Sequence, residues 1–287
     1  MTPIFALATS LLWGLADFGG GLLTRRIPAL TVVVVSQLLA LAALGTVVVA
    51  TGGWSEAGPQ FWYAVAAGVV GPVAMLFFYK ALALGPMGVV APVAALGGVM
   101  VPLGVGLAAG ERPGLLQVAG IVVAVAGVVL ASGSGGGGSV QQRTLLLTFV
   151  AALGFGTVMA LIAEASDNLT GLFLALFVQR LCNVLVGGGA LLVSTRRGTP
   201  ALPEEGLSAL VPALPALAFV GLADVAANGT YNLAANSGPV TVAAVLASLY
   251  PVVTALTARG VLNEKLRTVQ ASGAGLALVG TVLLASG

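Results

Sequence analysis

Four polar side chains follow one another inside a very hydrophobic stretch, "GLADVAANGTYNLAANSGP", residues 221–239. Asp224, Asn228, Tyr231 and Asn232 are spaced by four, three and one residues, so on an α-helix they share one face. This stripe of carboxylate, amide and phenol groups can hydrogen-bond either a polar ligand or a neighbouring helix. We interpret it as the wall of a binding site, with a structural network between helices as the alternative.

Arg180 is a second charged residue in an apolar segment, and it shares a helical face with Asn183. Its planar guanidinium group can hold a carboxylate or phosphate through two parallel hydrogen bonds. It can equally form an ion pair with Asp224. The sequence leaves both roles open.

Asp17 is the third charged residue in an apolar segment. It lies four residues after Trp13 and therefore on the same helical face. An aromatic ring beside a carboxylate suits an ammonium group, and a carboxylate in a low dielectric can also carry a proton near neutral pH. Asp17 and Asp224 are thus candidates for proton coupling. Tyr79 and Tyr250 are further candidate binding residues.

The residue inventory argues against several kinds of catalytic centre. The chain has no histidine and a single cysteine, Cys182, so we expect no metal or haem site, no disulfide and no cofactor. Asp17 and Asp224 each follow Gly-Leu-Ala, which is not the Gly-x-Gly-Asp pattern of intramembrane aspartyl proteases. We therefore expect no catalytic residues and no enzyme.

The composition indicates a membrane protein. Of 287 residues, 59% are hydrophobic and only 7% are charged, whereas soluble domains carry about 25% charged residues. A helical span needs about 20 apolar residues. Ten such segments are predicted, at 3–23, 28–50, 61–83, 89–107, 114–131, 144–165, 172–193, 210–234, 240–262 and 268–285.

Charged side chains inside these spans are costly to expose to lipid, because each costs about 2.5 to 3.5 kcal/mol at the centre of a lipid-facing helix. Asp17, Arg180 and Asp224 must therefore face a cavity or one another. The positive-inside rule sets the orientation, since the odd-numbered loops or their flanks carry most basic residues: Arg25, Arg26, Lys80, Arg143, Arg196, Arg197, Arg259, Lys265 and Arg267. Even-numbered loops carry only Arg112. Both termini are predicted on the outer side of a plasma (inner) membrane.

The two halves of the chain repeat each other. A shift that aligns Gly85-Pro86 with Gly238-Pro239 also aligns Glu111 with Glu264, Gln117 with Gln270, Gly120 with Gly273, and Gly127 with Gly280. Each unit contains five predicted helices, and an odd number inverts the second unit, as in many secondary transporters. We predict a first repeat at 1–131, a Gly/Ser-rich connector at 132–143 and a second repeat at 144–287.

These landmarks resemble the drug/metabolite transporter superfamily, EamA type. The resemblance is carried by the ten helices in two repeats, by the pair Trp13-Gly14 and by two matching series: Glu111, Gln117, Gly120 and Glu264, Gln270, Gly273. It implies an all-α membrane fold in which the first four helices of each repeat surround a central cavity and the fifth helices pack together. Independently, Gly120 with Gly127 and Gly273 with Gly280 form small-residue seams that suit such packing. One departure is that Gly154-Phe155-Gly156 stands where the first repeat has Trp13-Gly14.

The resemblance implies a secondary transporter that moves a small polar or amphiphilic metabolite by alternating access. We expect an amino acid or related compound, exported, with proton coupling as a hypothesis. The alternative is a transporter of organic cations such as quaternary amines or drugs; a scaffold without transport would leave the polar stripe unexplained. Arg180 discriminates between the substrates, because an Arg180 open to the cavity favours an anion or zwitterion, whereas an Arg180 paired with a carboxylate favours a cation. The expected partners are the substrate and the lipid bilayer, with no nucleic acid, and a monomer is compatible with the sequence.

Overall fold

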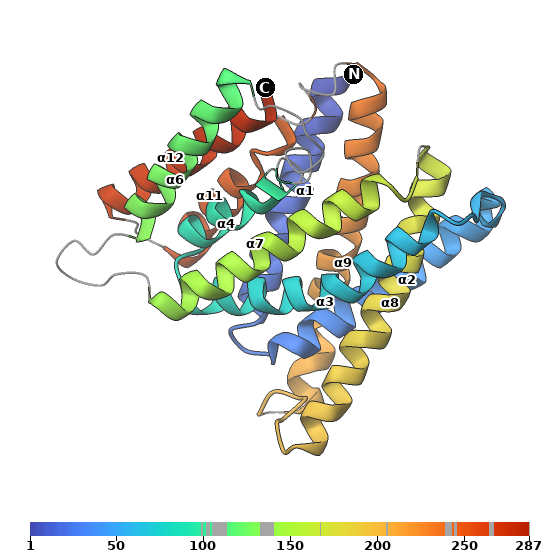
Figure 1. Ribbon diagram of the computed structural model, residues 1–287. Helices are drawn as coiled ribbons and strands as arrows, with labels where there is room; N and C mark the ends of the chain where they lie inside the picture. The colour runs from blue at the N-terminus through green and yellow to red at the C-terminus, as the bar shows by residue number, and fades with distance from the viewer. Residues whose placement is uncertain are drawn as a thin grey trace.

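The protein is an all-α bundle in the computed structural model (Figure 1). The structure describes residues 1–98, 100–101, 104, 114–132, 141–166, 168–204, 206–238, 243, 246–263 and 267–286. Glu111, Glu264, Pro239 and residues 133–140 of the predicted connector lie outside the described residues.

Ten α-helices and one 3-10 helix occur in the part of the chain that the structure describes. In the first half they are α1 (Thr2–Leu23), α2 (Ala29–Thr51), η1 (Gly53–Glu56), α3 (Phe61–Leu84), α4 (Met87–Ala95) and α6 (Leu115–Ser132). In the second half they are α7 (Gln142–Ala163), α8 (Leu169–Arg196), α9 (Leu207–Asn236), α11 (Tyr250–Leu262) and α12 (Thr268–Ser286).

These helices match the predicted spans in order and in most boundaries. Within the described residues, six helices, α1, α2, α3, α7, α8 and α9, are long and apolar enough to cross a membrane, and the apolar runs within α6 and α12 are shorter. Two helices are longer than predicted: α8 has 28 residues and α9 has 30. For α8 the extra length begins at a polar cap, because the side chain of Asn168 accepts a hydrogen bond from the backbone N–H of Gly171.

The helix pairing has the pattern expected for two inverted repeats. Helix α1 packs against α9 and α11, and the matching helix of the second half, α7, packs against α3 and α4. Helix α2 packs against α8 and α6 against α12, which joins each of these helices to its own counterpart, and α3 packs against α8 as α9 packs against α2. Exchanging the two halves leaves this pairing unchanged, as a pseudo-twofold axis requires.

Helices α6 and α12 are held together by the predicted glycine seams. A Cβ atom at Gly127 would lie 2.3 Å from the backbone nitrogen of Ala277, and one at Gly280 would lie 2.5 Å from that of Ala124. The two backbones therefore touch directly, which only small residues allow. The prediction that the fifth helices of the repeats pack together is confirmed.

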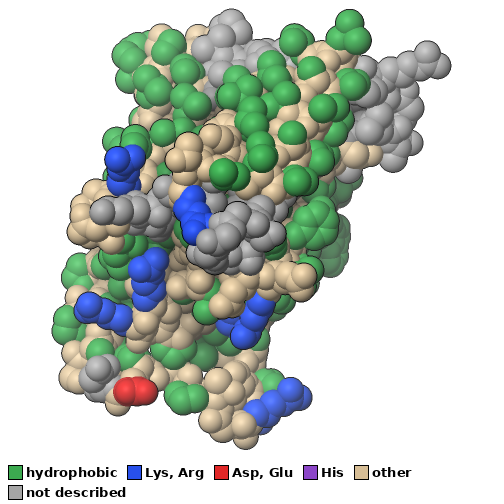
Figure 2. Space-filling view, turned by 90° about the vertical axis from the view of Figure 1, so that its left-hand side faces the viewer, with side chains coloured by type: hydrophobic (Ala, Val, Ile, Leu, Met, Phe, Trp, Pro, Cys, Tyr) green, Lys and Arg blue, Asp and Glu red, His purple; other side chains and the backbone are tan. Residues whose placement is uncertain are grey.

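Basic side chains mark one end of the bundle. Arg25 and Arg26 follow α1, Arg143 lies in the first turn of α7, and Arg196 and Arg197 lie at the end of α8. Figure 2 shows Lys and Arg side chains over the middle and lower part of the view, with hydrophobic side chains above them. In Figure 1 both termini lie at the top of the molecule; the side of the membrane that they face stays a prediction.

The glycine seam predicts a position-specific loss of stability. Replacing Gly127 with Val should force α6 and α12 apart and lower the free energy of unfolding by about 1 to 3 kcal/mol. Gly275→Ala on α12 is the matched control, because its Cβ would have no neighbour within 4 Å; this change should be neutral or stabilising. Thermal unfolding in detergent measures both, and equal melting temperatures for the two variants would contradict the packing argument.

Candidate functional site

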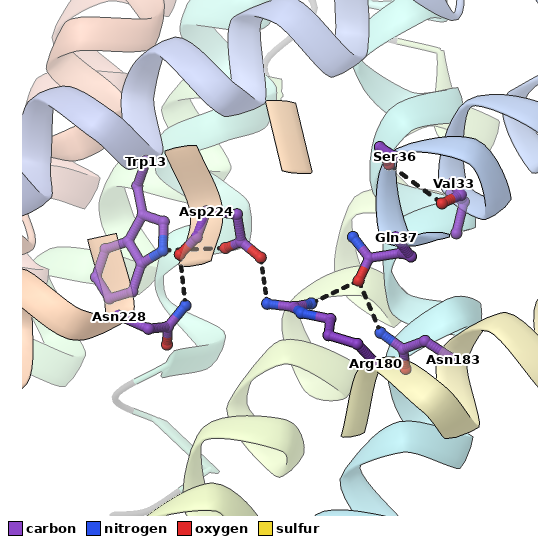
Figure 3. Close-up of polar contacts among 8 residues, drawn as sticks. All are labelled: Trp13, Val33, Ser36, Gln37, Arg180, Asn183, Asp224 and Asn228. Atoms are coloured by element: carbon purple, nitrogen blue, oxygen red, sulfur yellow. Dashed lines mark hydrogen bonds and ion pairs between the residues drawn. The ribbon is translucent and has the colours of Figure 1, made fainter. Parts of the chain in front are cut away.

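Arg180 and Asp224 form an ion pair between α8 and α9 (Figure 3). The Arg180 side chain is 5% exposed, whereas that of Asp224 is 24% exposed. Of the two roles left open by the sequence, Arg180 therefore adopts the ion pair in this structure. The pair is not sealed off, because part of Asp224 remains exposed.

Gln37 on α2 holds the other side of the guanidinium group. Its side-chain oxygen accepts a hydrogen bond of 2.7 Å from Nη1 of Arg180 and one of 3.1 Å from the amide of Asn183. Gln37 is completely buried. Sequence reasoning missed it, although its amide inside a predicted span was a signal that could have singled it out.

Two glycines let the helices approach closely enough to build this network. A Cβ at Gly221 of α9 would lie 2.2 Å from the backbone oxygen of Ser36, and a Cβ at Gly68 of α3 would lie 2.6 Å from that of Gln179. Gly68 and Gly221 are equivalent under the alignment of the two halves. Ser36 and Gln179 occupy matching places in these two contacts, and they immediately precede Gln37 and Arg180. The hydrogen bond between Gln37 and Arg180 therefore joins the two repeats.

The second oxygen of Asp224 faces α1. The indole N–H of Trp13 donates to Oδ1 of Asp224 at 3.2 Å. The ring of Trp13 also contacts Tyr231 and Tyr250, with centroids 6.0 and 5.8 Å apart. Both oxygens of Asp224 therefore have a donor, and Trp13 joins the carboxylate to an aromatic cluster.

Asp17, unlike Asp224, has no partner that compensates the charge of its carboxylate. Its carboxylate makes no hydrogen bond or ion pair to any described residue, and the residue keeps partial solvent accessibility. It lies one turn beyond Trp13 on α1 and within electrostatic range of Asp224, Tyr79 and Tyr250. An uncompensated carboxylate thus lies among aromatic side chains.

Tyr79 enters this region because α1 has a glycine opposite it. A Cβ at Gly20 would lie 2.4 Å from the phenol ring, so a larger residue would displace the ring. Tyr79 is 3% exposed, and it lies within electrostatic range of Arg180 as well as of the two acids. It is therefore the contribution of α3 to the cluster.

On α9, the predicted stripe continues from Asp224 through Asn228 to Asn232, toward the C-terminal end of the helix. Asn228 donates to the backbone oxygen of Asp224 at 2.8 Å, within its own helix. Asn232 accepts a hydrogen bond of 2.9 Å from Asn236, near the end of α9. The structure therefore joins Asp224 and Tyr231 to the cluster directly, whereas no contact to it is shown for Asn232.

Several buried polar atoms in and around the Arg180 hydrogen-bond network have no partner among the described residues. They are Nε2 of Gln37, Oε1 of Gln179, Nε of Arg180 and Oδ1 of Asn183. Two are donors and two are acceptors, so water or a polar ligand could satisfy them. In the described residues, no group of three His, Cys, Asp or Glu side chains is arranged to hold a metal ion.

The cluster has an apolar counterpart across the pseudo-twofold axis. Phe155 and Phe78 form an aromatic contact of 5.2 Å at the positions equivalent to Trp13 and Tyr231. Gly71 stands at the position equivalent to Asp224. The hydrogen-bonding groups of Trp13, Tyr231 and Asp224 therefore have apolar residues at the matching positions of the other half, as the stripe predicts.

Comparison with known proteins agrees with this architecture. The sequence model of the EamA-like transporter family matches residues 1–133 and 142–286, one match for each half of the chain. The chain belongs to the EamA-like transporter family. This EamA-like protein is therefore a multi-pass membrane transporter of the drug/metabolite transporter superfamily, with the lipid bilayer and a small-molecule substrate as its partners.

A solved crystal structure supports the same fold for the EamA-like chain. It superimposes with a TM-score of 0.61 over 98% of this chain and 95% of the other, at 19% sequence identity. That identity supports the fold alone. No curated protein matches the sequence significantly. The EamA-like family consists of transporters, which agrees with the expectation that this protein is not an enzyme.

The ion pair predicts strong energetic coupling. Asp224→Asn leaves the buried guanidinium group without its counterion and should cost about 3 to 5 kcal/mol of stability, and Arg180→Gln should also be destabilising. The double variant removes both charges, so it should be more stable than the sum of the two losses implies. Chemical unfolding of the four proteins in detergent gives the coupling energy, and strictly additive losses would show that the pair contributes nothing.

Proposed function

We propose that this EamA-like protein transports a small organic cation, with Asp17 as the acceptor of its positive charge. The proposal is the alternative that the sequence left open, and one observation carries it. Arg180 is paired with Asp224 and bonded to Gln37, whereas Asp17 has no compensating group among the described residues. A bound cation would supply that missing charge.

The aromatic residues around Asp17 support the same ligand class. Trp13 lies one turn away on α1 and contacts Tyr250 through its ring, and Tyr79 and Tyr250 lie within electrostatic range of Asp17. A cation held against the faces of Trp and Tyr rings gains roughly 0.5 to 2 kcal/mol, more as water is excluded. An alkylammonium or quaternary ammonium group combines the charge and the apolar surface that such a site requires.

An amino acid remains the second candidate substrate. Its ammonium group would suit Asp17, but its carboxylate would need a free cationic group. Both Nη atoms of Arg180 already have partners, and Asp224 already neutralises its charge, so a substrate carboxylate would have to compete with Asp224. The partial exposure of Asp224 is the observation that keeps this candidate open.

Proton coupling and export complete the proposal. Cation and proton would compete for the carboxylate of Asp17, and this competition would exchange one for the other as the two repeats alternate in access. Asp224 is the weaker coupling candidate, because Arg180 and Trp13 already satisfy its two oxygens. Export is the direction that the family resemblance implies.

Ligand binding tests the role of Asp17. Tetramethylammonium should raise the melting temperature of the purified protein, because a ligand stabilises the state that it binds, and Asp17→Asn should abolish the shift. Glu164→Gln is the matched control: it removes an exposed carboxylate at the end of α7 and should retain the full shift. A shift that persists in Asp17→Asn would refute the proposed cation site.

A parallel series with alanine separates the second candidate. If the substrate is an amino acid, alanine should stabilise the protein and tetramethylammonium should not. That stabilisation should also require Arg180. This result would replace the organic cation with the zwitterion.

Transport measures the coupling. In proteoliposomes with an acidic lumen, the outward proton gradient should drive accumulation of radiolabelled tetramethylammonium in the lumen against its concentration gradient, and Asp17→Asn should abolish the effect. Accumulation that ignores the imposed pH gradient would contradict proton coupling and leave cation binding intact.

A further inference from the structure

The site contains two carboxylates and one guanidinium group, so its charges do not cancel. Arg180 directs Nη2 to Oδ2 of Asp224, and Trp13 donates to Oδ1. Asp224 is thereby satisfied by its neighbours. Asp17 is left over, and it contributes one uncompensated negative charge whenever it is deprotonated.

Gln37 determines which acid Arg180 neutralises. Its oxygen accepts from Nη1 of Arg180 while Asn183 donates to the same oxygen, and the residue is completely buried between helices. Arg180 is also buried, at 5% exposure of its side chain. It cannot turn toward Asp17 without giving up both Gln37 and Asp224, and breaking such bonds in a low-dielectric site is costly.

Helix α1 brings Asp17 close to the ion pair. Asp17 lies one helical turn beyond Trp13, whose indole N–H donates to Oδ1 of Asp224. In such surroundings charges interact far more strongly than in water. A change of one charge in the Arg180–Asp224 pair must therefore alter what Asp17 can bind.

We propose that Arg180, positioned by Gln37, sets the valence of the transported cation at one. The inference rests on the proposed cation site and specifies the substrate class further. A monovalent cation neutralises the single remaining charge. A divalent cation would bring a second charge without a counterion into the site, and a buried charge of that kind is strongly disfavoured.

Four proteins separate charge from residue identity. With the carboxyl groups deprotonated, the wild type has one net negative charge at the site, Asp224→Asn has none, Arg180→Gln has two, and the double variant Arg180→Gln/Asp224→Asn has one again. The probes are butylamine and 1,4-diaminobutane, which share a chain length and differ in valence. Calorimetry in detergent at a pH below the amine pKa values gives the two dissociation constants.

The preference for butylamine over 1,4-diaminobutane should follow the net charge of the site. Wild type and the double variant should both prefer butylamine. Arg180→Gln should shift the ratio of the two dissociation constants at least tenfold toward the diamine, and Asp224→Asn should lose both ligands although Asp17 is intact. An equal ratio in Arg180→Gln and in the double variant would overturn the inference.

Gln37 requires its own test because it acts through Arg180. Gln37→Leu keeps the net charge but frees the guanidinium group, so butylamine binding should weaken several-fold. The same change in the Arg180→Gln background should have no further effect, which a merely structural role would not produce. Gln142→Leu is the control, since it makes the same change at an exposed amide in the first turn of α7, and it should leave the ratio unchanged.

The outcomes distinguish this inference from the proposed function. If wild type binds neither amine in a way that depends on Asp17, the cation site itself is wrong. If binding depends on Asp17 but the valence preference is the same in all variants, the cation site stands and the role of Arg180 is refuted.

Discussion

The need to compensate a buried guanidinium group governs the centre of this transporter. Arg180 lies within an apolar bundle, where an unpaired charge would cost several kcal/mol. Its two partners come from different helices, Asp224 on α9 and Gln37 on α2. These bonds tie α2, α8 and α9 together, and they leave Asp17 without a partner among the described residues. That is why we propose Asp17 as the group that a substrate neutralises.

The chemistry of the site is asymmetric although its scaffold is nearly symmetric. Glycines at equivalent positions, Gly68 and Gly221, bring helices into contact in both halves. The aromatic contact of Trp13 with Tyr231 likewise has its counterpart in Phe155 with Phe78. The departure noted in the sequence, Phe155 in place of a tryptophan, therefore removes an indole N–H where the equivalent of Asp224 is a glycine. The two halves thus share a backbone frame, while Trp13, Tyr231 and Asp224 have apolar residues at the matching positions.

The sequence predicted the scaffold well because membrane insertion imposes simple rules. Apolar length fixed most helix boundaries, and glycine spacing predicted the contact between α6 and α12, which backbone proximity confirms. The cost of buried charge singled out Arg180 and Asp224 and offered their ion pair as one alternative. Those rules depend on composition and spacing, which can be read along a single helix.

The details of the site depend on how the helices are rotated and shifted against each other. Gln37 is uncharged, so the cost of burying charge did not reveal it, and only its contact with α8 shows its role. Asn232 shares a helical face with Asp224, yet it bonds to Asn236 near the helix end. Periodicity predicts the face of a helix but not the depth at which a ligand would lie.

The central claim is that Asp17 presents an uncompensated charge to the substrate. The most direct measurement compares choline with its neutral carbon isostere, 3,3-dimethylbutan-1-ol, by calorimetry on the wild-type protein in detergent. The two molecules have nearly the same shape and differ in charge. The account predicts that choline binds at least tenfold more tightly, which corresponds to about 1.4 kcal/mol. Equal affinities would contradict it.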